Sequence, residues 1–214
     1  RKEQMADAIG RTLLRHGIGS LALDLPLDGE REGELEERSF RQPLALVRQW
    51  RLALAESAAA VAFLAAHEAV DAGRIAMIGY SLGSFIGVLT AAAEPRVRAV
   101  VVAAGGDLPA HTPFATLARA VADPLRAVRR LGGRPLLVVH GRRDRTVRPD
   151  QAERLYAAAS DPKTILWYTG LTSARIFFRP TKFPAIITIG SKFSTIRSAS
   201  SSPMPSGKAF PPRF

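Results

Sequence analysis

A serine that could act as a nucleophile stands in the motif Gly79-Tyr80-Ser81-Leu82-Gly83. An apolar run typical of a strand, Arg74–Gly79, precedes it, and a helix-like segment, Leu82–Ala93, follows it. In this context G-x-S-x-G forms a tight turn that projects the serine hydroxyl above a sheet. The first N–H groups of the helix can then stabilise a negatively charged oxygen. The motif therefore predicts Ser81 as nucleophile and the Leu82 N–H as an oxyanion-hole donor; a Gly-rich turn with an incidental serine is the alternative.

A candidate acid follows a second apolar run. Residues 135–140 read PLLVVH, and Asp144 comes shortly after them in the segment GRRDRTVRP. A carboxylate placed just beyond a strand can orient a catalytic histidine and stabilise its charged form. Alternatively, Asp144 pairs with a neighbouring arginine or caps a turn. Because Ser81 and Asp144 both follow strands, in this order, we favour the acid.

The remaining pattern gives the elements that must position these two residues. Along the chain, apolar patterns typical of strands alternate with patterns typical of helices, and Gly and Pro residues mark their ends. Strands are expected at Ile18–Leu25, Arg74–Gly79, Val97–Ala104, Pro135–His140 and Thr164–Tyr168. Helical stretches are expected at Met5–His16, Pro43–Ala69 (one helix or two), Leu82–Ala93, Pro113–Arg130 (broken near Pro124) and Pro149–Ala159. The alternation predicts an α/β fold with a doubly wound, mainly parallel sheet. Sites in such folds lie at the carboxyl ends of the strands, where Ser81 and Asp144 are expected.

Composition restricts the possible functions. The 214 residues, 47% of them hydrophobic, suffice for one globular domain. Cysteine is absent, which excludes disulfides, thiolate metal sites and a cysteine nucleophile, and the few dispersed histidines give no metal site. No apolar run reaches the length of a membrane span, and no secretory signal opens the chain, so we predict no membrane association and take a cytoplasmic location only as the default.

The chain changes character near Gly170. Residues 171–214 carry seven basic and no acidic residues and are rich in Ser and Pro, which predicts a disordered or irregular tail. Subtracting these seven charges from the net charge of +11 leaves +4 for residues 1–170. That body lacks a basic-aromatic stripe, so we predict no nucleic-acid binding. We therefore divide the chain into a core, residues 1–170, and a basic tail, residues 171–214; an ordinary flexible terminus and a reading-frame slip are the two hypotheses for the tail.

The motifs GYSLG, VRAVVVAAGG, PLLVVHGRRDRTVRPDQAERLY and TILWY together resemble the α/β-hydrolase superfamily. They look most like its dienelactone-hydrolase and prolyl-oligopeptidase-type esterase branch, over roughly residues 5–169. The resemblance implies an incomplete α/β-hydrolase fold, hydrolysis of carboxylic esters or related acyl compounds of low molecular weight through an acyl-enzyme, and no cofactor. Family members begin with earlier strands and a loop that supplies a second oxyanion N–H, so we expect the chain to be truncated at its N-terminus. Serine in the elbow favours an esterase over the cysteine-dependent dienelactone hydrolases.

The sequence departs from the family at the base. The family triad runs Ser, Asp, His, with the histidine after the last strand in a Gly-His context, but here Gly170 is followed by Leu171 and no histidine follows His140. We therefore expect impaired catalysis. His111, in the loop after the third predicted strand, is the candidate substitute base, ahead of His140, which we expect to be structural. The alternative is an inactive fold remnant that binds a ligand or partner. The sequence does not predict an oligomeric state.

Overall fold

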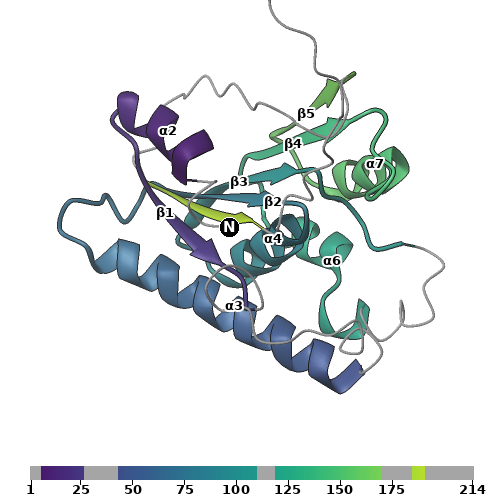
Figure 1. Cartoon of the computed structure of the whole chain (residues 1–214), viewed down its shortest axis with the longest axis horizontal. Coiled ribbons are helices and arrows are strands. Elements are labelled where there is room, and N and C mark those ends of the chain that lie inside the picture. Colours follow the sequence, from purple (N-terminus) through teal and green to yellow (C-terminus); the bar gives the residue numbers. More distant parts are fainter. Residues whose placement is uncertain (1–5, 27–42, 110–118, 170–184, 191–214) are drawn as a thin grey trace, which may run out of the picture.

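The computed structural model describes residues 6–26, 43–109, 119–169 and 185–190. Its centre is one sheet of six parallel strands in the order β1-β6-β2-β3-β4-β5 (Figure 1). The strands are β1 (Gly19–Asp24), β2 (Ile75–Tyr80), β3 (Val97–Ala103), β4 (Leu136–Gly141), β5 (Lys163–Tyr168) and β6 (Ala185–Gly190). The predicted α/β class with a doubly wound, mainly parallel sheet is confirmed.

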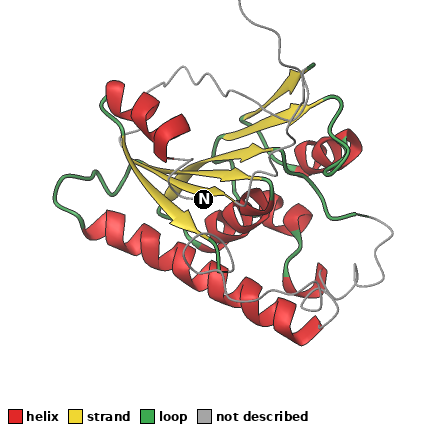
Figure 2. Ribbon diagram, viewed as in Figure 1, coloured by secondary structure: helices red, strands yellow, loops and turns green. Residues whose placement is uncertain are grey.

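Helices cover both faces of this sheet (Figure 2). They are η1 (Ala6–Gly10), α2 (Arg11–Arg15), α3 (Pro43–Ala66), α4 (Leu82–Ala93), α6 (Pro124–Arg129) and α7 (Pro149–Ala158). The short α2 lies on one face, and α3 and α4 lie on the other. Among the described residues, no helix is both long enough and apolar enough to cross a membrane.

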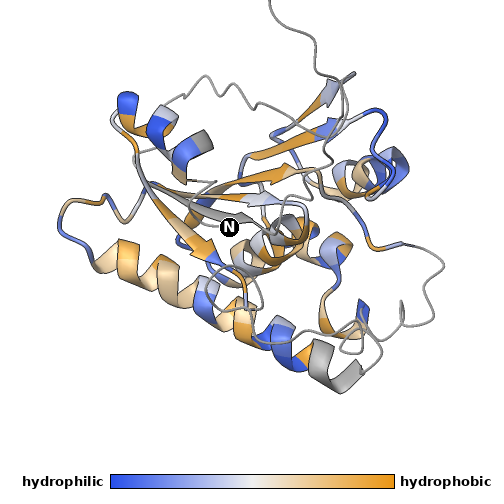
Figure 3. Ribbon diagram, in the orientation of Figure 1, coloured by the Kyte–Doolittle hydropathy of each residue, from blue (hydrophilic) through white to orange (hydrophobic). Residues whose placement is uncertain are grey.

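The core follows the alternation of side chains along the buried strands. Ile75 and Met77 of β2 pack into a cluster with α3, α4, α6 and α7. The residues between them, Ala76 and Ile78, belong to a second cluster with Leu13 of α2. Strands buried on both faces read as nearly continuous apolar runs, which explains why β3 is mostly orange in Figure 3.

Local signals fix the two helices beyond β3. Asp123 caps α6: its carboxylate accepts hydrogen bonds from the backbone N–H groups of Leu125 and Arg126, at 2.9 and 3.2 Å. Proline occupies the first turn of both α6 and α7, where its missing N–H costs nothing. Helix α7 thus begins at the predicted residue, and α6 begins at Pro124, where the predicted helical stretch Pro113–Arg130 was expected to be broken.

One strand was not predicted. We expected Thr164–Tyr168 to be the last strand, but β6 follows it in the chain and lies between β1 and β2. Its sequence, AIITIG, is rich in β-branched residues, a local signal that the composition of the surrounding tail obscured. The other residues after Thr169 lie outside the described residues, and the division into core and tail at residue 170 stays a prediction.

Candidate active site

The turn that carries Ser81 has the strained geometry expected of a nucleophile elbow. Ser81 directly follows β2 and precedes α4, with φ 51° and ψ −120°. A non-glycine residue with positive φ costs about 1–3 kcal/mol, and such strain concentrates at functional sites. The backbone N–H of Ser81 donates to the Ala103 carbonyl at the end of β3, at 2.9 Å. The Ser81 carbonyl accepts from the Ser84 N–H at 2.9 Å and from the Ser84 hydroxyl at 2.6 Å. These bonds hold the turn at the carboxyl edge of the sheet.

Glycine is required where the strand before the elbow meets the helix after it. A Cβ atom on Gly79 would lie 2.4 Å from the Gly83 carbonyl oxygen and 2.4 Å from the Ser84 Cα. A Cβ on Gly105, beyond β3, would lie 1.7 Å from the Ser84 hydroxyl. Real Cβ atoms do not approach other atoms this closely, so the turn depends on both glycines.

The predicted oxyanion donor lies at the start of α4. Leu82 is the first helical residue, and the first N–H groups of a helix have no acceptor within the helix. Leu82 is 41% exposed. The Leu82 N–H is therefore available to an oxygen bound beside Ser81.

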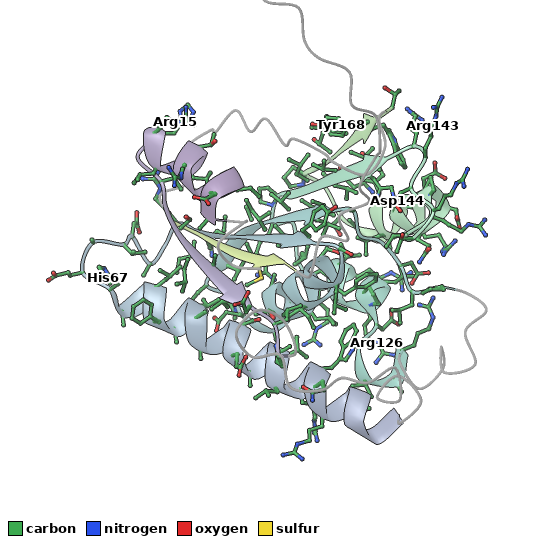
Figure 4. The ribbon with its side chains drawn as sticks, viewed as in Figure 1. Arg15, His67, Arg126, Arg143, Asp144 and Tyr168 are labelled. Carbon is green, nitrogen blue, oxygen red and sulfur yellow. The ribbon has the colours of Figure 1, made fainter. Side chains whose placement is uncertain are left out.

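The predicted acid lies in a turn that uses one of its two carboxylate oxygens. Asp144 is nearly buried, and its Oδ1 accepts from the N–H groups of Thr146 at 2.8 Å and Val147 at 3.1 Å. Within the described part of the chain, no hydrogen bond or ion pair reaches Oδ2. Asp144 thus caps a turn, as the alternative interpretation held, and keeps one oxygen open toward a further donor. Figure 4 shows Asp144 near Tyr168 and Arg143, at the carboxyl ends of β4 and β5.

Tyr80, the residue before Ser81, lies within electrostatic range of Asp144. Burial raises the pKa of the Tyr80 phenol above its ordinary value, and the negative charge of Asp144 raises it further. Tyr80 directly precedes Ser81, so the carboxylate acts electrostatically on the residue next to the nucleophile. Ser81 follows β2 and Asp144 follows β4, and the carboxyl ends of these parallel strands lie at the same edge of the sheet.

Three of the four histidines lie among the described residues, and none has the expected position of a triad base. His140 is buried, and its Nε2 lies 2.9 Å from the Val147 carbonyl, so it supports the turn that holds Asp144. His16 is exposed at the end of α2. His67 is exposed beyond the end of α3, on the far side of the molecule from Asp144 (Figure 4). His111, the candidate substitute base, lies outside the described residues.

A buried aspartate that sequence reasoning missed joins this site to the rest of the fold. Asp107, 2% exposed, follows β3 and accepts from Arg119 Nη2 and Arg154 Nε, each at 2.9 Å. Its backbone N–H donates to the Gln151 carbonyl at 2.9 Å, and the Gln151 amide donates to the Asp107 carbonyl. The loop after β3 is thereby fixed to the first turn of α7, just beyond the Asp144 turn. The sequence feature that could have identified Asp107 is Gly105-Gly106-Asp107, which directly follows a predicted buried strand.

The Asp107 carboxylate should make folding sensitive to acid. Burial alone would raise the pKa of Asp107, but hydrogen bonds from Arg119 and Arg154 outweigh it and hold the pKa below its usual value. A lowered pKa in the folded state contributes stability above the unfolded pKa, about 3.9, which is lost as the pH falls through the folded value. We expect Asp107→Asn to lower the free energy of unfolding at pH 7 by about 1–3 kcal/mol and to flatten its fall below about pH 4. Urea titrations from pH 7 to pH 3 measure both effects.

The control for this prediction is Asp150→Asn. Asp150 also accepts from Arg154, at 2.6 Å, but its side chain is 44% exposed. Exposed ion pairs contribute little to stability, so the free energy of unfolding of this variant should stay close to that of the parent at every pH. Equal losses in the two variants would contradict the special role of Asp107.

Two further features of the described residues concern the binding of metals and ligands. No group of three or more metal-binding side chains occurs among them. A cavity of about 180 Å³ lies between α4 and α6, lined in part by Leu89, Ala92, Arg126 and Ala127. It is at the opposite end of α4 from Ser81, so it is not the pocket of the candidate nucleophile.

Comparison with known proteins agrees with this geometry. Residues 5–192 match the profile of the alpha/beta hydrolase family. The chain belongs to the α/β-hydrolase family. The predicted superfamily is confirmed by this match, and the chain is a hydrolase by family; its own activity stays a proposal.

Similar proteins add partial likenesses to this α/β-hydrolase. Two uncharacterized proteins, from two strains of Mycobacterium tuberculosis, are 32% identical to it over 123 residues, which is 55% of this chain and 44% of theirs. The chain thus spans less than half the length of these relatives. A solved Thermus thermophilus structure has a TM-score of 0.52 at 24% identity and covers 80% of this chain and 76% of its own, which is a likeness of fold. The esterase domain of a Rhodothermus marinus protein is 25% identical, with a TM-score of 0.42, over 53% of this chain and 56% of its own.

Proposed function

We propose that this α/β-hydrolase cleaves carboxylic esters of small molecules through an acyl-enzyme formed on Ser81. The observation that carries the proposal is the backbone of Ser81, held at positive φ between β2 and the first turn of α4. A chain keeps such strain only where surrounding structure imposes it, and here the strained residue is a half-buried serine at the start of a helix. Membership in a hydrolase family supports the same assignment.

The proposed reaction has two steps. The Ser81 oxygen attacks the ester carbonyl, a bond forms between them, and the N–H of Leu82 donates to the resulting oxyanion. The alcohol then departs with a proton, leaving an acyl group on Ser81, and water releases the acid in the second step. The exposed side chain of Leu82 offers an apolar contact to the substrate beside the nucleophile.

Asp144 is proposed as the acid of this site, with Oδ2 available to orient a base. No histidine follows His140, so the serine proton passes to solvent or to a histidine recruited from elsewhere, such as His111. We therefore expect slow turnover. The same missing histidine supports the second candidate function, an inactive α/β-hydrolase that binds a ligand without turning it over.

Turnover of p-nitrophenyl acetate tests the proposal. The parent chain should hydrolyse this activated ester slowly, and Ser81→Ala should reduce the rate to that of the uncatalysed reaction. Ser57→Ala is the matched control, because it removes a buried hydroxyl that donates to the Ala53 carbonyl within α3, away from the elbow. Turnover that persists in Ser81→Ala would contradict the nucleophile, and ester binding without turnover would favour the second function.

A further inference from the structure

The cavity between α4 and α6 combines an apolar wall with positive charge. The two helices pack side by side (Figure 1), and the space between them has a volume of about 180 Å³. Its apolar lining residues come from these helices and from the segment before α6: Leu89, Ala92, Ala93, Ala120, Val121 and Ala127. Its charged lining residues, among those that the structure describes, are three arginines and one aspartate: Arg119, Asp123, Arg126 and Arg130. This described lining therefore has a net charge of +2.

Asp123, the acid of this lining, is already engaged by other groups. Its Oδ1 accepts from the backbone N–H groups of Leu125 and Arg126, at 2.9 and 3.2 Å. The same oxygen lies 3.6 Å from Arg119 Nη1. Arg119 also forms a two-pronged ion pair with the buried Asp107, from Nη1 to Oδ1 and from Nη2 to Oδ2, each at 2.9 Å. Both carboxylates are therefore paired with Arg119 and not with the other two arginine side chains of the lining.

Arg126 and Arg130 bring two positive charges to the cavity from the end of α6 (Figure 4 labels Arg126). They lie four positions apart, a spacing that places two side chains on the same side of a helix. Neither guanidinium forms a hydrogen bond or an ion pair within the described part of the chain. The dipole of α6 favours basic residues near this end, but like charges at this spacing repel each other. An anion bound between them would relieve that repulsion and accept charge-assisted hydrogen bonds.

The volume and the lining of the cavity favour a small anion with an apolar body. An apolar cavity of roughly 150 Å³ is known to bind benzene, so about 180 Å³ suffices for one such ring. A ring against Leu89 and Ala92 would remove apolar surface from water. A carboxylate suits the planar fork of an arginine, which can bind both of its oxygens. Inorganic phosphate offers the charge without the apolar surface, so it would leave the apolar wall unused.

We propose that the cavity between α4 and α6 binds a small carboxylate with a compact apolar body, and that Arg126 and Arg130 hold its carboxylate group. The site is distinct from the nucleophile elbow, because Leu89 and Ala92 lie roughly 10–15 Å beyond Leu82 along α4. The proposal therefore does not rest on ester hydrolysis by Ser81.

Calorimetric titration of the full chain with benzoate tests the site. Benzoate supplies one ring and one carboxylate, and we expect saturable binding at millimolar concentration. Arg126→Gln combined with Arg130→Gln should weaken this binding at least about tenfold, because two charge-assisted donors are lost. Arg129→Gln is the matched control, since Arg129 is an exposed arginine of the same helix that is not among the described lining residues. A folded parent chain without saturable binding, unchanged binding in the double variant, or an equal loss in Arg129→Gln overturns the proposal.

A ligand series and methyl spectra test the ligand class and the location. Benzyl alcohol has the ring without the charge, and inorganic phosphate has the charge without the ring, so each should bind at least about tenfold more weakly than benzoate. Either of them binding as tightly as benzoate overturns the proposed ligand class. Benzoate should shift the methyl resonances of Leu89 and leave those of Leu82, beside Ser81, unchanged. Shifts at Leu82 alone would place benzoate at the candidate active site and overturn the proposal.

Discussion

A histidine placed after β5 is expected to raise ester turnover by about 10²–10⁴-fold, the usual contribution of a positioned general acid–base. The variant is Leu171→His, which creates the Gly-His sequence that α/β-hydrolases carry at this point. Asp144 has a free carboxylate oxygen to orient an imidazole, and Ser81 is already held at its elbow. Position 171 lies outside the described residues, so its choice rests on the sequence alone. The value of kcat/KM for p-nitrophenyl acetate measures the gain.

Three further variants separate a restored triad from an incidental effect. Leu171→Gln introduces a polar side chain without a base and should give no gain. Adding Ser81→Ala to Leu171→His should abolish turnover, and adding Asp144→Asn should remove most of the gain, because the imidazole loses its orienting charge. The same gain in Leu171→Gln, or a gain independent of Ser81, would be incompatible with the proposed site.

Gly79→Ala is expected to destabilise the fold by about 3 kcal/mol, the upper end of ordinary overpacking. The added Cβ would lie 2.4 Å from backbone atoms of both Gly83 and Ser84, and backbone atoms in a helix start cannot move aside as a flexible side chain can. Urea unfolding followed by circular dichroism gives the free energy of unfolding. Because the elbow must open to relieve the contact, the variant should also lose the reactivity of Ser81.

The matched control, Gly87, lies in α4, the helix whose start Gly79 contacts. A Cβ on Gly87 would meet Met77 Sδ at 3.5 Å and Cγ at 3.6 Å, which are ordinary contacts. Replacing glycine by alanine inside a helix usually stabilises by about 0.5–1 kcal/mol, so Gly87→Ala should be more stable than the parent. Two glycine-to-alanine changes eight positions apart are thus expected to act in opposite directions, and a shared direction would contradict the packing described at the elbow.

Local features of this fold could be predicted from the sequence. The helix from Leu82 to Ala93 has the predicted bounds, because the elbow motif marks its start and Pro95 follows its end. The positive φ of Ser81 is likewise a consequence of the motif between a strand and a helix.

Long-range features could not be predicted in the same way. The position of β6 depends on the open edges of β1 and β2, more than a hundred residues earlier, and no local pattern encodes such pairing. The ion pair between Asp107 and Arg154 joins residues 47 positions apart, and it becomes visible only when the loop after β3 meets α7. From the sequence, capping a turn and acting as the acid are alternative roles for Asp144. In the structure Oδ1 caps the turn and Oδ2 stays free, so the two roles are compatible.

The central claim is that Ser81 is an activated nucleophile, and labelling of the parent chain with a fluorophosphonate probe tests it most directly. We expect slow, covalent modification, located by mass spectrometry on the peptide that contains Ser81 and absent from a folded Ser81→Ala variant. A folded parent chain that resists the probe, or a label that persists in Ser81→Ala, would contradict the claim and leave this α/β-hydrolase as a binding protein.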